Sequence, residues 1–578
     1  MQQKRNQMHW IAFLKTHWKR ILWYFLTLFL FSFLLYYVIY SSIYIIQTYS
    51  GNLTNWVAVV GLIFNFLILI VELFSAFFSV FIYYYIGSSS SYKKIQDFNN
   101  KYLVSDPLPT VTILLPFYKE PLAVVSKTID GSLNLDYPKD RYEVIVCDDS
   151  PPEHSKEIKT YCEERNIKFI QRSERIGFKA GAINNALKQV NSDFFGILDS
   201  DHIPTPNFIR TCLSGFVEDD IILVQGKPAF VNQDNYLMRS SAYIHTQFFH
   251  VYQKSRGTRN GVIFAGTTGI FRTVLLKEAG GFLEDTLAED TDTSFVLMSK
   301  GYKTRYIHEV CSKGLVPWNP ISMINQVWRW TNGITSIFRK RLFTIIKGKN
   351  SFINKIDIVS TVLTPIIGIS MWFVYLLLFI MYLLKEFSNY NTEMNFVRPD
   401  MGQNIPLLLL APVLISFASL IMALVAWRRE EKEDKMIKLR GFFGMVWTIT
   451  AFYLLMMTAQ SFLVWAVLSA LLGVRKEFDR TVKEKTKTMG KMSKKIKYTL
   501  WSIGLFILSI GYYFASIRSF ILGDPLGGWF IIGAITITIP IIITIQHFRQ
   551  LETMKKVAAT RTALDVEKEH GEKLNGGN

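Results

Sequence analysis

Two aspartates separated by one residue, Asp199 and Asp201, follow an apolar run of the chain that ends at Leu198. If that run continues as an extended strand, the alternation of side chains places both carboxylates on the same side of the backbone. Two carboxylates so placed can hold one hard divalent cation, Mg²⁺ or Mn²⁺, which can in turn hold phosphate oxygens. The same residues are also compatible with a strand that simply ends in an acidic loop. The residues around the pair must decide between these two interpretations.

Two further apolar runs of the chain also end in polar groups. Short apolar strings that alternate with polar helical stretches indicate an α/β fold with a mainly parallel sheet. In such sheets ligands bind at the carboxyl ends of the strands, so we expect these groups to lie near the aspartate pair. They are Tyr118 and Glu120 after one run, and Asp148 and Asp149 after the other. Asp148 and Asp149 could instead simply end their strand and cap a helix.

Two other segments carry groups that a transfer reaction needs. Lys179 opens a helical stretch and could neutralise phosphate charge, although a solvated surface lysine fits equally well. Glu289 and Asp290 stand at an expected helix start. A carboxylate there can act as the general base that accepts a proton from an attacking hydroxyl. Acidic residues are also favoured in the first turn of any helix, where they interact with the helix dipole.

A third segment combines a basic and an aromatic residue on one predicted helix. Gln326, Arg329 and Trp330 share one helix face, because residues three and four apart are neighbours on a helix surface. Arg329 could pair with a pyrophosphate, and Trp330 could give a sugar an apolar platform. The alternative is an interfacial amphipathic helix whose tryptophan lies at the level of lipid headgroups. The two interpretations are compatible.

The composition indicates a membrane protein. Half of the 578 residues are hydrophobic and the formal net charge is +18. This is more apolar than a soluble protein of ordinary composition. The charge could reflect nucleic acid, an anionic membrane or an anionic substrate; the lysine-rich stretch borders an apolar run, which favours lipid and argues against nucleic acid. The four cysteines lack the spacing of a zinc site or a disulfide framework.

Long uncharged runs predict membrane-spanning helices, which need about 20 apolar residues each. If every run crossed, the lysine-rich segment 474–498 would lie outside, against the positive-inside rule. We therefore infer that the run 441–473 does not cross but either lies at the interface or re-enters, which leaves six crossings and places the large domain and both termini in the cytoplasm. The expected order is a basic N-terminus (1–20), two spans (21–86), a cytoplasmic domain (87–334), an interfacial segment (335–355), two spans (356–427), a cytoplasmic or interfacial segment (428–498), two spans (499–546) and a polar tail (547–578).

Taken in order, these motifs resemble those of the membrane-embedded processive family 2 glycosyltransferases, the group of cellulose, chitin, hyaluronan and poly-N-acetylglucosamine synthases. The likeness covers roughly residues 20–545 and includes the Q-x-x-R-W pattern that begins at Gln326. It implies a glycosyltransferase-A type domain, with a Rossmann-like mixed sheet, inserted in a transmembrane helical bundle with interfacial helices. It also implies Mg²⁺ or Mn²⁺ as cofactor and a multi-pass protein of the plasma membrane. A nucleotide sugar, a growing glycan or lipid acceptor and membrane lipids are the implied partners.

The resemblance also assigns roles to individual residues. The loop around Gly266 is similar to the acceptor-side loop of these enzymes, where close backbone approach needs glycine. Residues 478–483 resemble the gating loop of cellulose synthases, except that Arg480 stands where valine is usual. This arginine could contact phosphate directly. The implied set is Asp199 and Asp201 for the metal; Tyr118, Glu120, Asp148, Asp149, Lys179 and Asp199 for the donor nucleotide; Asp290 and Glu289 for catalysis; Gln326, Arg329, Trp330, Gly266 and Thr267 for phosphate and acceptor; and Phe478, Arg480, Thr481 and Lys483 for the gating loop.

The implied reaction is inverting transfer of a hexose or N-acetylhexosamine from a nucleotide sugar, first of all a UDP-sugar, to a growing β-linked polysaccharide. Transfer would be coupled to translocation of the glycan across the membrane. His202 resembles the histidine of the D-x-D-H-x-P motif in cellulose synthases and favours a glucose-like donor slightly. UDP-N-acetylglucosamine and a GDP-mannose-type donor stay open. The alternatives are a non-processive transferase that adds one sugar to a lipid, and a transporter with a cytoplasmic domain.

Overall fold

The structure is a computed structural model of the 578-residue chain. It describes residues 56–387 with few gaps, together with separated stretches of 21–47 and 420–538. The expected N-terminus (1–20), the gating loop with Phe478, Arg480, Thr481 and Lys483, and the tail (547–578) lie outside the described residues.

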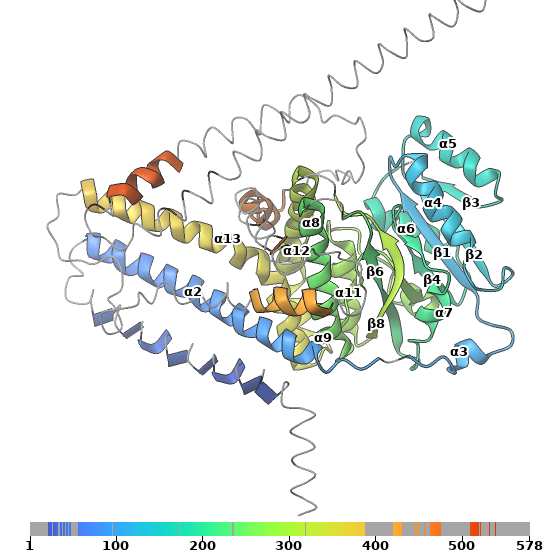
Figure 1. Cartoon of the computed structure of the whole chain (residues 1–578), viewed down its shortest axis with the longest axis horizontal. Coiled ribbons are helices and arrows are strands. Elements are labelled where there is room, and N and C mark those ends of the chain that lie inside the picture. Colours follow the sequence, from blue (N-terminus) through green and yellow to red (C-terminus); the bar gives the residue numbers. More distant parts are fainter. Residues whose placement is uncertain are drawn as a thin grey trace, which may run out of the picture.

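One mixed sheet organises the large domain, in the order β3-β2-β1-β4-β7-β6-β8-β5 (Figure 1). Its strands β1 to β4 are joined in parallel, β7 runs antiparallel to both of its neighbours, and β6 and β8 are parallel to each other. The mixed sheet implied by the sequence is thereby confirmed. The strands are β1 (Val111–Phe117), β2 (Tyr142–Asp148), β3 (Lys168–Gln171), β4 (Phe194–Ile197), β5 (Ile203–Pro204), β6 (Ile221–Phe230), β7 (Gly269–Arg272) and β8 (Lys303–Gly314).

Both faces of the sheet are buried, which explains the continuous apolar runs in the sequence. On β1, Ile113 packs into one core cluster and its neighbour Leu114 into the other. This alternation is the expected geometry of a strand with helices on both sides. The first cluster is covered by α4 (Leu122–Leu133), α5 (Pro152–Glu163) and α7 (Phe208–Leu213), and the second by α6 (Phe178–Leu187), α10 (Thr273–Glu278) and α11 (Glu289–Lys300). The short helix α3 (Lys101–Val104) precedes β1.

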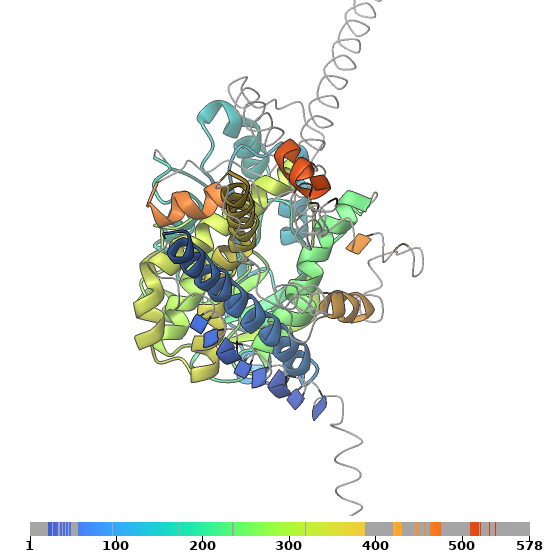
Figure 2. The same ribbon diagram turned by 90° about the vertical axis from the view of Figure 1, so that its left-hand side faces the viewer.

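Helices that leave the sheet domain form a second part of the molecule. The long helices α2 (Trp56–Ser89) and α13 (Phe352–Phe387) contact each other and extend away from the sheet (Figure 1). Figure 2 views them from their far ends, where they lie beside one another. Between them and the sheet lie α8 (Tyr236–Gln247), a π-helical segment (Phe248–Gln253), α9 (Lys254–Gly257) and the amphipathic helix α12 (Pro320–Lys347). The Asn332 amide of α12 donates to the Ala466 carbonyl (3.0 Å), so the described helix 463–471 packs on α12.

A buried polar junction holds α9 against α2 and α13. The Asp357 carboxylate accepts hydrogen bonds from Arg256 (3.0 Å from both Nε and Nη2), from Arg259 Nη2 (2.5 Å) and from the Tyr85 hydroxyl. The Asp357 side chain is 3% exposed. Because charges this deeply buried must be paired, the junction fixes how the sheet domain sits on the two long helices.

Within the described residues, one segment satisfies the length and composition of a membrane span, namely Phe352–Ser370 in α13. Much of the remaining apolar sequence lies in stretches that the structure does not describe. The six-span organisation, the interfacial or re-entrant assignment of 441–473 and the cytoplasmic side of the large domain therefore stay predictions.

Candidate active site

A cavity of about 400 Å³ opens at the carboxyl ends of β1 and β4. It is bounded by the ends of these strands, the starts of α6 and α11, the loop before β7 and one face of α12. The structure thus brings together residues that are far apart in the sequence. The predicted residues that line it are Tyr118, Glu120, Asp149, Lys179, Asp199, Asp201, Gly266, Thr267, Glu289, Asp290, Gln326, Arg329 and Trp330.

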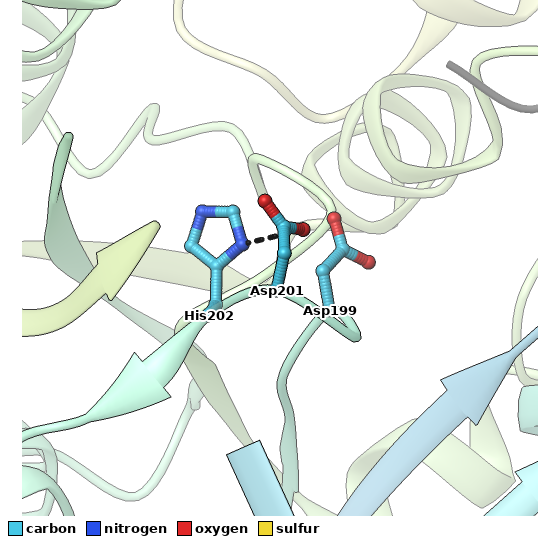
Figure 3. Close-up of side chains that lie close together, drawn as sticks. All are labelled: Asp199, Asp201 and His202. Carbon is cyan, nitrogen blue, oxygen red and sulfur yellow. Dashed lines mark hydrogen bonds and ion pairs between the residues drawn. The ribbon is translucent and has the colours of Figure 1, made fainter. Parts of the chain in front are cut away.

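The aspartate pair lies in a turn rather than on an extended strand. β4 ends at Ile197, and the His202 amide donates to the Asp199 carbonyl (3.0 Å), which closes a tight turn. The prediction of strand alternation is wrong here, because the turn and not the pleat brings the carboxylates together (Figure 3). Thr267 Oγ1 accepts a hydrogen bond from the Asp199 amide (3.0 Å), and Asp201 Oδ2 accepts one from the Leu315 amide (3.2 Å).

The turn also presents a set of groups that could bind a metal ion. Asp199, Asp201 and His202 each offer one ligand atom, and these atoms lie within 4.8 Å of one another. Asp201 and His202 are buried, and their Oδ1 and Nδ1 atoms are 3.3 Å apart. His202 Nε2 is buried and lacks a hydrogen-bond partner in the described part of the chain. Two carboxylates and an imidazole fit a divalent ion such as Mn²⁺ or Mg²⁺.

Lys179 lies inside the cavity and not on the outer surface. α6 begins at Phe178, directly after Gly177 in the left-handed region (φ +72°), and this turn directs the lysine to the strand ends. The ammonium donates to Asp199 Oδ1 (2.5 Å) and to the Gly266 carbonyl (2.7 Å). Burial alone lowers the pKa of Lys179, but the negative charges of Asp199 and Glu289 outweigh it, so the pKa is raised. The group is therefore a permanent cation at neutral pH.

Two acids at the start of α11 face this cation. Burial is the main cause that raises the pKa of Asp290, with the Lys179 charge acting in the opposite direction. Burial and then the Asp290 charge raise the pKa of Glu289 to about 7. The Thr291 amide donates to Asp290 Oδ1 (2.6 Å) and fixes that carboxyl. A carboxylate of raised pKa is a stronger proton acceptor, which suits a general base.

The loop before β7 approaches the acids so closely that it needs glycine. Gly266 has φ +80°, and a Cβ at this position would lie 2.9 Å from Asp290 Oδ2 and 3.5 Å from Lys179 Nζ. Buried Gln225 on β6 holds the loop, because its amide donates to the Thr267 carbonyl (2.9 Å) and its oxygen accepts from the Ala265 amide (2.9 Å). Gln225 was not among the predicted site residues. The signal in the sequence that could have indicated Gln225 is its amide directly after the apolar run 221–224.

The two aspartates at the end of β2 have different surroundings. Asp148 is fully buried and does not line the cavity; its carboxylate accepts from the Ser150 amide (2.9 Å) and from the Ser155 hydroxyl (2.8 Å). Asp149 lines the cavity and forms a two-point pair with Arg172, whose Nε lies 2.7 Å from Asp149 Oδ1. The structure therefore separates Asp148 from the predicted donor site and gives it the alternative role, which is to shape the strand end.

Aromatic side chains form the opposite wall of the cavity. The three residues of the Q-x-x-R-W motif line it from α12. His245 of α8 stands edge-on to the Trp330 ring, with centroids 5.7 Å apart, and stacks on Phe230 at 4.1 Å. His245 and Phe230 also line the cavity but were not predicted, because nothing in the sequence near them carries a chemical motif.

Comparisons with known proteins agree on one class of enzyme. The family model described as "Glycosyl transferase family group 2" matches residues 194–387. The chain is 32% identical over 240 residues to the cellulose synthase 1 catalytic subunit [UDP-forming] of Komagataeibacter xylinus. It is 30% identical over 239 residues to the cellulose synthase catalytic subunit [UDP-forming] of Pseudomonas fluorescens (strain SBW25). Each match covers 40% of this chain and 32% of the relative, so the chain matches about a third of the length of these curated relatives.

Two solved structures match parts of this chain, each with a TM-score below 0.5. The mannosyltransferase PcManGT from Pyrobaculum calidifontis, in complex with GDP-Man and Mn²⁺, has a TM-score of 0.43 and 17% identity. That alignment covers 70% of this chain and all of the mannosyltransferase (100%). S. aureus TarS 1–349 has a TM-score of 0.31 and 16% identity, with 64% of this chain and 94% of TarS 1–349 covered.

Proposed function

We propose that this chain, a family 2 glycosyltransferase related to cellulose synthase catalytic subunits, transfers a hexose or N-acetylhexosamine from a UDP-sugar to a growing β-linked glycan. Transfer inverts the configuration at the anomeric carbon and is coupled to passage of the glycan across the membrane. One observation carries the proposal. The ammonium of Lys179 joins Asp199, at the donor end, to the Gly266 loop, which lies against Asp290.

The donor half of the site must neutralise a diphosphate leaving group. Asp199, Asp201 and His202 would hold a divalent cation, which supplies positive charge to the phosphate oxygens when bound. Lys179 adds a fixed positive charge beside Asp199. Preorganised charges of this kind stabilise the charge that develops on the leaving group. Arg329, which lines the same cavity from α12, is placed to contribute a second protein cation.

The acceptor half must position a sugar hydroxyl and remove its proton. Trp330, supported by the edge contact of His245, offers an apolar face on which a sugar ring can lie. Asp290 takes the proton as the hydroxyl attacks the anomeric carbon, and burial, which raises the pKa of Asp290, makes it a better proton acceptor. The oxygen–carbon bond forms as the bond between the sugar and the diphosphate breaks, so no covalent enzyme intermediate is needed.

The polymer, the translocation and the location of the site are parts of the same proposal. Support comes from the cellulose synthase relatives, from the Q-x-x-R-W residues in the cavity wall and from the contact of the sheet domain with α2 and α13. We infer a multi-pass protein of the plasma membrane whose sheet domain is cytoplasmic, where nucleotide sugars are available. Residues 428–498 would supply the gating loop.

The test is synthesis by the purified full chain in lipid with Mg²⁺ or Mn²⁺ and a panel of radiolabelled nucleotide sugars. We expect a long, gel-retained product from one UDP-sugar. Asp290→Asn should abolish transfer but leave nucleotide binding largely intact, and Asp201→Ala should weaken metal-dependent nucleotide binding. A lipid that carries a single sugar would instead identify a non-processive transferase. Full turnover by Asp290→Asn would exclude Asp290 as the base.

A further inference from the structure

The part of the cavity around Tyr118 contains a cation, Arg175, to which neither the motifs nor the comparisons assign a role. The guanidinium carbon of Arg175 lies 3.3 Å from the ring centroid of Tyr118. Both side chains line the cavity. Tyr118 is among the residues assigned to the donor nucleotide, and its ring could stack on the nucleobase, yet one face of that ring is covered by this guanidinium. The stack therefore occupies part of the place expected for the base.

The side chain of Arg172 holds the backbone that follows Arg175. Arg172, paired with Asp149, also donates to the Ile176 carbonyl (2.7 Å) and to the Phe178 carbonyl (2.9 Å). The Arg172 and Asp149 side chains are 11% and 4% exposed, so this support is shielded from solvent. Gly177 then turns the chain into α6 with φ +72°. Because the backbone that follows Arg175 is fixed in this way, the fold presents Arg175 to Tyr118.

A guanidinium in this position has a specific binding capacity. It is planar, stacks on aromatic rings and can stack a nucleobase on its other face. We propose that Arg175 is the residue on which the uracil base of the donor stacks, with Tyr118 supporting the guanidinium from behind. The proposal rests on the proposed function, because it requires a uridine nucleotide as ligand. A base that stacked directly on this face of Tyr118 would first have to displace Arg175, and the two arrangements give opposite mutational results.

The test measures binding alone and so does not depend on the acceptor. The affinities of uridine and of UDP are measured by their displacement of a fluorescent UDP analogue from the full chain in lipid nanodiscs. Arg175→Ala should lower the affinity for both ligands by the same factor, roughly 5- to 100-fold, which is the usual range for loss of one stacking partner. Arg175→Lys keeps the charge but loses the planar face, so it should lose nearly as much.

A matched control exists in the same domain. The guanidinium of Arg165 lies 3.5 Å from the Tyr161 ring centroid on α5, and neither residue lines the cavity. Arg165→Ala removes an equivalent stack and should leave both affinities unchanged. Equal thermal unfolding midpoints for the Arg165 and Arg175 variants would show that the Arg175 effect is not a loss of folding.

Three results separate the possibilities. Unchanged or tighter uridine binding by Arg175→Ala would mean that Arg175 only covers Tyr118, and would overturn the inference. Weaker binding of UDP but not of uridine would assign Arg175 to the phosphates and would equally overturn it. If the unaltered chain binds neither uridine nor UDP, then the proposed uridine donor is wrong, whatever the role of Arg175.

Discussion

The ammonium of Lys179 lies 2.5 Å from Asp199 Oδ1 and 2.7 Å from the Gly266 carbonyl, so a single side chain joins the two halves of the cavity. Lys179→Ala should reduce kcat by about 10²- to 10³-fold, the range observed when one preorganised group that stabilises developing charge is removed. Initial rates at saturating donor would measure this. Lys188→Ala is the control, because Lys188 is exposed at the other end of α6. Similar rates for the two variants would show that Lys179 does not act on the leaving group.

The paired acids of α11 predict how the rate depends on pH. Burial raises the pKa of both groups, that of Glu289 to about 7, and the base acts only when deprotonated. The rate should therefore rise with pH toward neutrality and level off above the higher pKa of the pair. Glu289→Gln removes the group whose pKa is raised to about 7, so the rise should move to the lower pH range in which Asp290 alone titrates. Profiles of kcat/KM from about pH 5 to about pH 9 would measure this, and an unshifted profile would contradict the coupling.

The strands and the place of the site could be predicted from the sequence, because both follow from local patterns. Two of the short apolar strings that predict the sheet are residues 111–115, which lie within β1, and residues 168–171, which coincide with β3. Parallel strands end at one edge, so the polar residues after β1, β2 and β4 had to meet there. These predictions needed only the alternation of short apolar strings with polar helical stretches and the order of the motifs along the chain.

The divided roles of Asp148 and Asp149 could not be predicted in this way. Asp148 is the last residue of β2 and Asp149 is the first residue after it, and the sequence does not say which of the two side chains faces the cavity. Asp148 points to Ser155 of α5, whereas Asp149 points to the cavity and Arg172. The contacts of Gln225 with the Gly266 loop and of His245 with Trp330 were equally out of reach, because each joins segments that only the tertiary fold brings together.

Gly266→Ala tests the close approach of the loop to Asp290. The substitution combines an unfavourable backbone at φ +80° with a Cβ that would lie 2.9 Å from the Asp290 carboxylate. We expect a loss of transfer much larger than the loss of stability. Gly280→Ala is a matched control, because Gly280 has φ +94° and a Cβ there would meet nothing within 4 Å. In both variants the unfavourable backbone conformation should lower the free energy of unfolding by about 1 kcal/mol, which an unfolding measurement would show. Equal transfer activities of the two variants would therefore refute a specific role for Gly266.

The Asp357 junction predicts a stability effect outside the cavity. Asp357→Asn keeps the shape of the side chain but removes the charge that neutralises Arg256 and Arg259. Two buried guanidinium groups would then face each other without a counter-charge, at a cost of about 3–5 kcal/mol. The midpoint of thermal unfolding of the full chain in nanodiscs should therefore fall strongly. Hydrogen exchange should increase first in α9 and the start of α13, because this is where the carboxylate holds the two parts of the molecule together.

Asp219→Asn is the matched control for the junction. Asp219 pairs with Lys101, but the two side chains are 74% and 61% exposed. An exposed pair contributes at most about 1 kcal/mol, so this variant should unfold almost as the unaltered chain does. If both variants had the same midpoint, the charge of Asp357 would not be needed to dock the sheet domain. The remaining contacts between α9, α2 and α13 would then be sufficient to hold that domain in place.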